Sequence, residues 1–201
     1  SLGGGMFSRM DNYIQKQLPF DIPSFDEYAN NSVKYLVDYF NSKQDLSFTP
    51  EILIEPGTAL ASKALDFAVQ VVSVKNINNE FYINTSGSKY NMNPSPNRIN
   101  SPTEVYNSNI NNAIHVKKAK LSGYTCIESD IIHDDFSGDI AKGDTIIFKE
   151  VGAYSVVMKP PFILPDVAII QFNKNTNCYD LIRCKQTFND VFHNFKFLKN
   201  D

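Results

Sequence analysis

The sequence predicts a mixed α/β and β fold, in which the last part of a β/α barrel is followed by an all-β barrel or sandwich. In the first third of the chain a helical pattern, an apolar run and a second helical pattern follow one another, which is typical of a β/α barrel. From about Phe67 the pattern changes to alternating β-branched residues and short apolar runs separated by Gly or Asn turns. We therefore expect two domains, over residues 1–66 and 67–201.

The first domain has a clear helix start and a clear strand. Ser24 and Glu27 have the spacing of a capping box, so we expect a helix over about 25–43. Its apolar positions are spaced for one buried face: Tyr28, Val33, Leu36, Val37 and Phe40. Pro50 ends the helical tendency, and the apolar run after it predicts a strand over 51–55.

The second domain reads as a series of short strands. Valines from 69 to 74 and the run 81–83 flank an Asn-rich turn and predict a hairpin. Residues 86–111 are rich in Ser, Asn and Pro, and we expect a long loop there. Further apolar runs predict strands over 112–120, 123–132, 144–150, 154–158, 167–172 and 178–184, with a short helix over 186–193.

Composition excludes several classes of protein. A hydrophobic content of 42% indicates a globular chain, and a net charge of −3 with scattered lysines indicates no nucleic-acid partner. No apolar run is long enough to span a membrane, so we expect no membrane partner. Three cysteines without metal-ligand spacing fit free thiols in the cytoplasm. The three histidines lack partners at metal-binding spacing, and we expect no metal.

Two short stretches place backbone and acid groups where an anion could bind. Glu55 ends the predicted strand, and Gly57 after Pro56 lets the backbone come close to a ligand. Gly3, Gly4 and Gly5 can turn several backbone N–H groups toward one anion, although a glycine triplet is equally consistent with a linker. Taken alone, Glu-Pro-Gly is usually a plain turn.

Two further motifs change this interpretation. They are Gly123-Tyr124-Thr125-Cys126-Ile127-Glu128-Ser129-Asp130 and Gly152-Ala153-Tyr154. In this order, the four motifs resemble the C-terminal half of the pyridoxal-phosphate-dependent amino acid decarboxylases of the ornithine/diaminopimelate/arginine type, which share the alanine racemase fold. The resemblance covers nearly all of this chain but about half of a family member. It implies a remnant of the barrel that binds pyridoxal phosphate, then the C-terminal β-domain.

The resemblance implies a cofactor site. Gly3, Gly4, Gly5, Gly57, Thr58 and Tyr154 would contact the cofactor phosphate. Glu55 would face the pyridine nitrogen, where a carboxylate favours the protonated ring. Family members usually have an arginine where this chain has Thr58, and a neutral donor binds phosphate less strongly than a charged one.

It also implies a site shared by two subunits of a homodimer. Cys126 would reach the neighbouring subunit's active site and protonate the substrate carbon after decarboxylation. Many relatives place an acid directly after this cysteine, to bind the distal amine of the amino acid substrate, and here Ile127 stands there. Glu128 and Asp130 are the nearby acids that we expect to contact the substrate, and simple ornithine or lysine specificity is not expected.

The family's Schiff-base lysine belongs to an early barrel strand that this sequence lacks. The chain begins at Ser1 without a methionine, and we interpret it as an expression product, a processed product or the surviving half of a larger enzyme. We expect it to need the missing N-terminal barrel half and to be inactive alone. The alternative is a decarboxylase-like binding or assembly module without catalysis.

Overall fold

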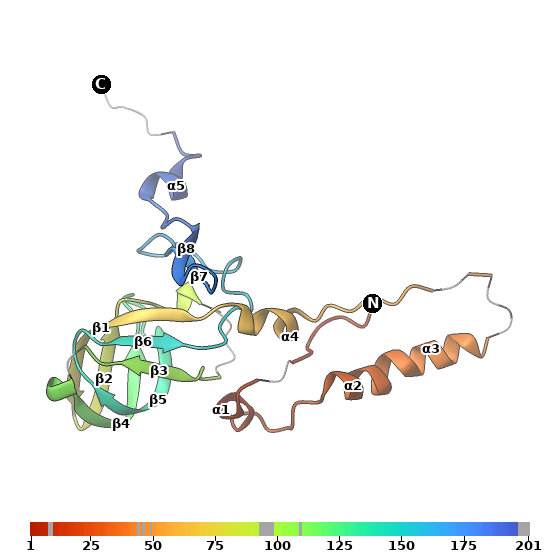
Figure 1. Ribbon diagram of the computed structural model, residues 1–201, viewed down its shortest axis with the longest axis horizontal. Coiled ribbons are helices and arrows are strands. Elements are labelled where there is room, and N and C mark those ends of the chain that lie inside the picture. Colours follow the sequence, from red (N-terminus) through yellow and green to blue (C-terminus); the bar gives the residue numbers. More distant parts are fainter. Residues whose placement is uncertain are drawn as a thin grey trace.

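The computed structural model describes residues 1–7, 10–43, 45, 47–48, 50–92, 99–108 and 110–196. Its centre is a six-stranded sheet in the order β3-β6-β1-β2-β4-β5 (Figure 1). The strands are β1 Phe67–Ile77, β2 Glu80–Thr85, β3 Thr103–Tyr106, β4 Ile114–Ser122, β5 Ile131–Ile140 and β6 Thr145–Phe148. Neighbouring strands are antiparallel except for β2 and β4, which run parallel.

The sheet curls around one apolar core. Along β1 buried and exposed residues alternate, so that Phe67, Val69 and Val71 point inward. Side chains from β2, β4, β5 and β6 complete the core, and the fully buried large ones are Ile83, Val116, Leu121, Ile140, Ile146 and Phe148. The predicted change to β-structure at Phe67 is therefore confirmed, with β1 beginning at that residue.

The two edge strands, β3 and β5, come close enough to make the sheet a nearly closed barrel. Thr103 of β3 and Phe136 of β5 line one cavity of about 490 Å³. Just before β3, the Asn100 amide donates to Asp134 Oδ1 at 2.7 Å and its oxygen accepts from the Asp134 backbone N–H at 3.2 Å. The gap is covered by the short helix α1 (Asn12–Gln15), because Tyr13 also lines this cavity.

Helix α1 is attached to the sheet through a buried histidine. His133 of β5 is 2% exposed, and its Nε2 lies 3.0 Å from the Tyr13 hydroxyl. Its Nδ1 accepts the backbone N–H of Asp135 at 3.2 Å, which assigns the ring proton to Nε2 and the ring to its neutral form. Burial lowers the pKa of His133 to about 4, although Asp134 and Asp135 act in the opposite direction.

This histidine makes stability depend on pH. Its pKa lies below the ordinary value of 6.5, so the unfolded chain takes up a proton as the pH falls from 6.5 to about 4 while the folded chain does not. We expect the free energy of unfolding to drop by about 2 kcal/mol between pH 7 and pH 5 from this group alone. Urea unfolding at both values should show a smaller drop for His133→Gln. His115→Gln, at an exposed histidine, is the control; equal drops in all three proteins would contradict the prediction.

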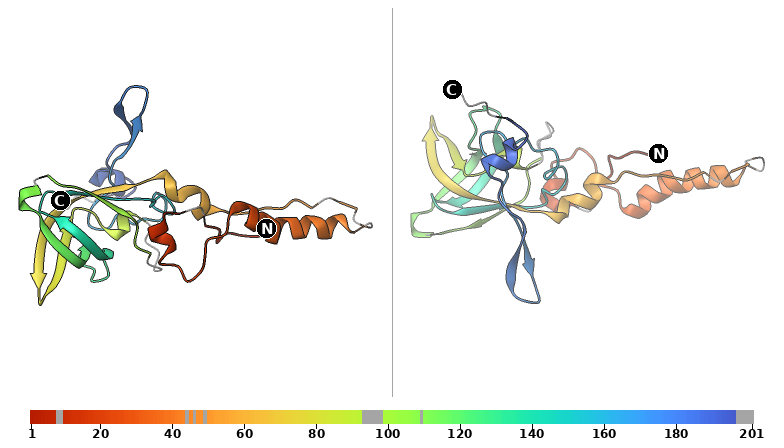
Figure 2. Two further views of the ribbon diagram at one scale, coloured as in Figure 1. Left: turned by 60° about the horizontal axis from the view of Figure 1, so that its bottom comes forward. Right: turned by 90° about the horizontal axis from the view of Figure 1, so that it is seen from above.

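A helical unit projects from the sheet (Figures 1 and 2). It consists of α2 Phe25–Tyr28, a π-helical turn at Ala29–Val33 and α3 Lys34–Asn41. The predicted capping box is confirmed, since Ser24 Oγ accepts the Glu27 backbone N–H at 3.2 Å and Glu27 accepts the Ser24 backbone N–H at 2.7 Å. No residue of this unit is fully buried. On the apolar face that the spacing predicts, Val37 is exposed, and the others are half-buried: Tyr28, Val33, Leu36 and Phe40. Whether the unit is a barrel remnant stays a prediction.

The chain continues after the sheet with a hairpin and a short helix, as predicted. They are β7 Ile169–Asn173, β8 Cys178–Arg183 and α5 Phe188–Phe192. Pairing places Ile170 opposite Leu181 and Phe172 opposite Tyr179, and all four side chains are exposed. The hairpin therefore carries an uncovered apolar face.

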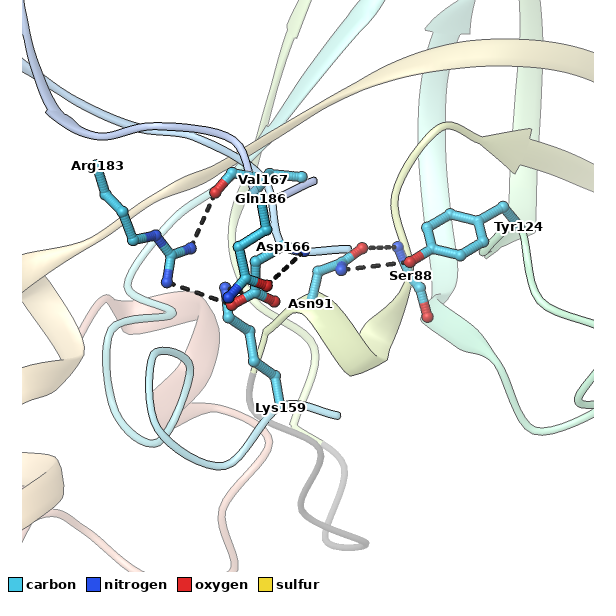
Figure 3. Close-up of polar contacts among 8 residues, drawn as sticks. All are labelled: Ser88, Asn91, Tyr124, Lys159, Asp166, Val167, Arg183 and Gln186. Atoms are coloured by element: carbon cyan, nitrogen blue, oxygen red, sulfur yellow. Dashed lines mark hydrogen bonds and ion pairs between the residues drawn. The ribbon is translucent and has the colours of Figure 1, made fainter. Parts of the chain in front are cut away.

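A buried carboxylate anchors the base of this hairpin (Figure 3). Asp166 lies 3.3 Å from Arg183 and 3.3 Å from Lys159, and its backbone exchanges hydrogen bonds with Gln186. Arg183 also donates to the Val167 carbonyl at 2.9 Å. The Lys159 side chain is 4% exposed, and this burial lowers its pKa.

Three local predictions for the second domain were wrong. The predicted strand over 123–132 is a loop as far as Asp130, and 154–158 lies in a turn, in which Tyr154 has a φ of +64°. The long loop predicted over 86–111 contains β3, and its residues 93–98 and 109 lie outside the described part of the chain. Within that part, no helix is both long and apolar enough to cross a membrane.

Candidate functional site

The glycine triplet lies beside the Glu-Pro-Gly turn. The Leu2 backbone N–H donates to the Leu53 carbonyl at 2.9 Å, and the Glu55 N–H donates to the Gly3 carbonyl at 2.8 Å. A Cβ at Gly4 would lie 2.9 Å from the Glu55 carbonyl oxygen, so the two segments approach too closely for a larger residue. Residues 50–56 contain no strand, so the strand predicted over 51–55 is not formed.

Glu55 and Gly57 are joined through a tight turn at Pro56. The Gly57 N–H donates to the Glu55 carbonyl at 2.8 Å, and helix α4 (Gly57–Ala61) follows. The Glu55 carboxylate is exposed and accepts the Ser1 hydroxyl at 2.8 Å. The carboxylate is therefore open to a ligand, whereas the Gly57 amide would have to give up an existing hydrogen bond to bind phosphate.

Tyr154 is brought to the same place by the turn after β6. The Val151 and Gly152 N–H groups donate to the carbonyls of Leu65 and Ser62, at 3.0 and 2.9 Å, and attach this turn to the segment that follows Gly57. The Tyr154 hydroxyl lies 3.7 Å from where a Cβ on Gly57 would be. Residues that the sequence places far apart thus meet, and Gly3, Gly4, Glu55, Gly57 and Tyr154 form one connected surface.

Next to this surface is a cavity of about 320 Å³. Its polar lining consists of Thr58, Ser62, Lys89, Ser101, Glu150 and Tyr154, and its apolar lining includes Phe7, Ile14, Met92 and Ile132. Glu150 is already engaged, since one carboxylate oxygen lies 3.7 Å from Lys63 and the other accepts the Asp11 N–H at 3.3 Å. Sequence reasoning missed Lys89, which lies in a Ser- and Asn-rich stretch without a motif.

Cys126 lies at the tip of a loop that is fixed at its base. Cys126, Ile127 and Glu128 are exposed, while Asp130 is 2% exposed. The Gly123 N–H donates to the Asp130 carbonyl at 2.8 Å and the Asp130 N–H donates to the Ile127 carbonyl at 2.9 Å, which closes the loop. The thiol and the Glu128 carboxylate are therefore presented outward by a defined backbone.

The Asp130 carboxylate is the centre of this arrangement. It accepts the Ser88 hydroxyl at 2.9 Å, the Lys89 N–H at 2.9 Å, and the Thr125 hydroxyl and N–H at 2.7 and 3.2 Å. A Cβ on Gly123 would lie 2.1 Å from Asp130 Oδ2, so glycine is required there. A substrate contact was predicted for Asp130, but its oxygens are occupied inside the protein, and its part in substrate binding stays a prediction.

Further hydrogen bonds join Ser88 to Asn91 and Asn91 to Tyr124 (Figure 3). The Ser88 N–H donates to Asn91 Oδ1 at 3.0 Å, and the Asn91 amide donates to the Tyr124 hydroxyl at 3.4 Å. Burial raises the pKa of Tyr124, so this hydroxyl stays protonated near neutral pH. The 3₁₀ turn Lys89–Asn91 is thus held to the loop that carries Cys126.

Within the described ranges, no group of three or more His, Cys, Asp or Glu side chains is placed to hold a metal ion. His133 belongs to β5 and lies buried against Tyr13 of α1. That no metal takes part in the function stays a prediction.

Comparison with solved structures shows the fold. The diaminopimelate decarboxylase from Helicobacter pylori, complexed with L-lysine, matches with a TM-score of 0.70 and 20% identity, over 95% of this chain and 43% of that one. The diaminopimelate decarboxylase from M. jannaschii, also complexed with L-lysine, matches with a TM-score of 0.73 and 18% identity, over 98% of this chain and 42% of that one. The arginine decarboxylase of Paramecium bursaria Chlorella virus matches with a TM-score of 0.56 and 21% identity, over 80% of this chain and 40% of that one.

This chain therefore spans less than half the length of these enzymes. Comparison with curated proteins gives no match. A family model described as "Pyridoxal-dependent decarboxylase, C-terminal sheet domain" matches residues 32–152, which is more than half of the chain and includes the whole six-stranded sheet. The chain belongs to the family of pyridoxal-dependent decarboxylases, with the sheet as the domain that the family model describes.

Proposed function

We propose that these 201 residues form the C-terminal part of a pyridoxal-phosphate-dependent amino acid decarboxylase. The observation that carries the proposal is the meeting of the glycine triplet, Glu55, Gly57 and Tyr154 on one surface, within a chain of this family. When bound, pyridoxal phosphate supplies a ring that accepts the electrons of the breaking bond between Cα and the carboxylate.

The chain's own residues fit the phosphate and ring nitrogen of this cofactor. The backbone at Gly3 and Gly5 has φ angles of +69° and +83° and lies beside the Glu55 turn without Cβ atoms in the way. Thr58 and Tyr154 add hydroxyl donors at the neighbouring cavity. Glu55, with its exposed carboxylate, would hold a proton on the pyridine nitrogen.

Cys126 and Glu128 would act on the substrate. The loop closed by Asp130 holds the Cys126 thiol outward, where it can donate a proton to Cα after carbon dioxide leaves. We propose that this loop enters the site of a second copy, in a homodimer with shared active sites. Glu128 would contact the amino acid, and Ile127 favours a substrate whose distal end is not a bare primary amine.

The covalent lysine would come from the larger part of such enzymes that these residues do not cover. A cytoplasmic enzyme fits three free, exposed cysteines. The chain alone would then bind the phosphate end of the cofactor weakly and release no carbon dioxide, because covalent capture needs a lysine held against the aldehyde.

Combination with the barrel part of the natural gene tests this proposal. We expect no carbon dioxide from diaminopimelate, arginine, ornithine or lysine with the 201 residues alone, and release from at least one amino acid with the combined protein. Decarboxylation by the chain alone, with a borohydride-trapped adduct at one of its own lysines, would refute the need for the barrel. A folded, cofactor-loaded combination that is inactive on all amino acids would favour the non-catalytic module.

A further inference from the structure

We propose that Lys89 is the cation of an anion-binding site that it forms with Thr58 and Tyr154. The inference rests on the proposed function for the identity of the anion, although the site itself is defined by the geometry. Lys89, Thr58 and Tyr154 line one cavity of about 320 Å³, although they come from three separate parts of the chain. Together these three side chains supply two hydroxyls and an ammonium, which are donors for a phosphate or a carboxylate.

The charge of Lys89 has no acidic partner in the part of the chain that the structure describes. Among the described residues, no carboxylate lies within 4 Å of its Nζ; its contacts are Ser129 Oγ at 3.4 Å and the Tyr90 ring at 5.2 Å. The other charged residue of the cavity, Glu150, is held by Lys63 and the Asp11 N–H. The lining of the cavity therefore includes one half-buried lysine with no carboxylate within 4 Å among the described residues.

The position of Lys89 is fixed by its backbone. Its N–H donates to the buried Asp130 carboxylate at 2.9 Å, and Ser88 caps the turn that Lys89 begins. A cation on a fixed backbone loses less conformational entropy on binding than one on a mobile loop. The same carboxylate closes the loop of Cys126, so the anion site and the thiol share one support.

Lys89 also accounts for Thr58. At this position the resemblance leads us to expect an arginine, and a hydroxyl alone gives a weaker contact to phosphate than a charged donor. A lysine from the sheet domain, reaching the cavity beside Thr58, restores the missing positive charge from a different element. The anion is then the cofactor phosphate or a carboxylate of the substrate, and both have the same chemistry for this site.

Binding to the 201-residue chain tests the proposal without catalysis. The probes are pyridoxine 5′-phosphate, which lacks the aldehyde and cannot react with amines, pyridoxine, which lacks the phosphate, and glutarate, which carries carboxylates. Calorimetry or ligand-observed NMR gives each affinity. We expect tighter binding of pyridoxine 5′-phosphate than of pyridoxine, and a loss of about tenfold for the phosphate probe in Lys89→Met.

Two matched variants separate the effect of the charge at position 89 from a loss of folding and from a change in the net charge of the chain. Lys89→Arg keeps the cation and should keep most of the affinity, while Lys142→Met removes a charge from an exposed site on the sheet domain and should change nothing. A Lys89-dependent affinity for glutarate with none for the phosphate probe would assign the site to the substrate carboxylate. Equal affinities in Lys89→Met and the unsubstituted chain, or no anion binding at all, would overturn the proposal and leave the decarboxylase assignment to its own assay.

Discussion

Replacing Asp130 with alanine is expected to lower the free energy of unfolding by about 3–5 kcal/mol, because the donors that face this carboxylate would be left buried without a partner. The hydrogen bonds from Ser88, Lys89 and Thr125 would be lost together. Urea unfolding measures the change. Glu128→Gln, at an exposed carboxylate of the same loop, should stay within about 0.5 kcal/mol of the unsubstituted chain.

A second measurement separates loop order from overall stability. In a background with Cys178 and Cys184 replaced by serine, the reaction rate of Cys126 with a thiol reagent reports on the loop. The conservative variant Asp130→Asn, measured at urea concentrations well below its unfolding transition, should change this rate. The control Glu128→Gln should leave the structure of the loop unaltered. A mutation usually lowers the free energy of unfolding by about 1 kcal/mol. If Asp130→Ala lowers it by no more than about this amount, and the reaction rate of Cys126 is unchanged, the role given to this carboxylate is contradicted.

Replacing Cys126 with alanine in the protein combined with its barrel part is expected to lower the rate of product formation by about 10²–10⁴-fold, which is the usual contribution of a positioned proton donor. Cofactor affinity should stay the same, because Cys126 belongs to the loop closed by Asp130 and not to the surface formed by Gly3, Glu55 and Gly57. Rates and cofactor titrations on the same samples check both halves of the expectation.

The chain offers its own control for this experiment. Cys178 is also a free, exposed thiol, but it begins strand β8 of the outer hairpin. Cys178→Ala should therefore leave the rate unchanged. A Cys126→Ala enzyme as active as Cys178→Ala would remove the cysteine from the mechanism, and a loss of cofactor affinity would give it a structural role instead.

Local signals in the sequence predicted the parts of the fold that depend on neighbouring residues. The β1–β2 hairpin turns at Asn78 and Asn79, whose φ angles of 52° and 66° suit asparagine, and the alternation of valines sets the buried face of β1. The helix at Ser24 begins with the capping box that the spacing indicated. Local signals also predicted the strands β7 and β8 and the helix α5.

Contacts between distant residues explain what could not be predicted. The stretch after Gly123 was predicted as a strand, but backbone bonds from Gly123 and to Ile127 close it into a loop at Asp130. The Asp130 carboxylate of this loop is held by Ser88, 42 residues away. Strand β3 has little periodicity of its own and is defined by its pairing with β6. Likewise, the histidine beside Asp134 and Asp135 has no local sign of burial, since its partner Tyr13 lies 120 residues earlier.

For the candidate site, motifs indicated the residues but not their surroundings. Gly3, Glu55, Gly57 and Tyr154 were named from the resemblance, and the structure places them together. It also gives Asp130 internal partners and places Lys89 in the lining of the same cavity as Thr58, neither of which follows from spacing along the chain. The roles of all these residues stay predictions until the proposed measurements are made.

The strand order has a consequence for how this domain reaches its native state. Strand β1 pairs on one side with β2, the next strand in the chain, but on the other side with β6. Phe67 can therefore pair only after Phe148 has been synthesised. Such distant pairing is slow because a long loop must close before any contact forms. Until β6 is synthesised, the β1–β2 hairpin has one open edge and an uncovered row formed by Phe67, Val69 and Val71. Nascent chains that stop before residue 145 would therefore expose an unpaired strand edge that can pair with another chain. At this stage of synthesis a chaperone would be needed.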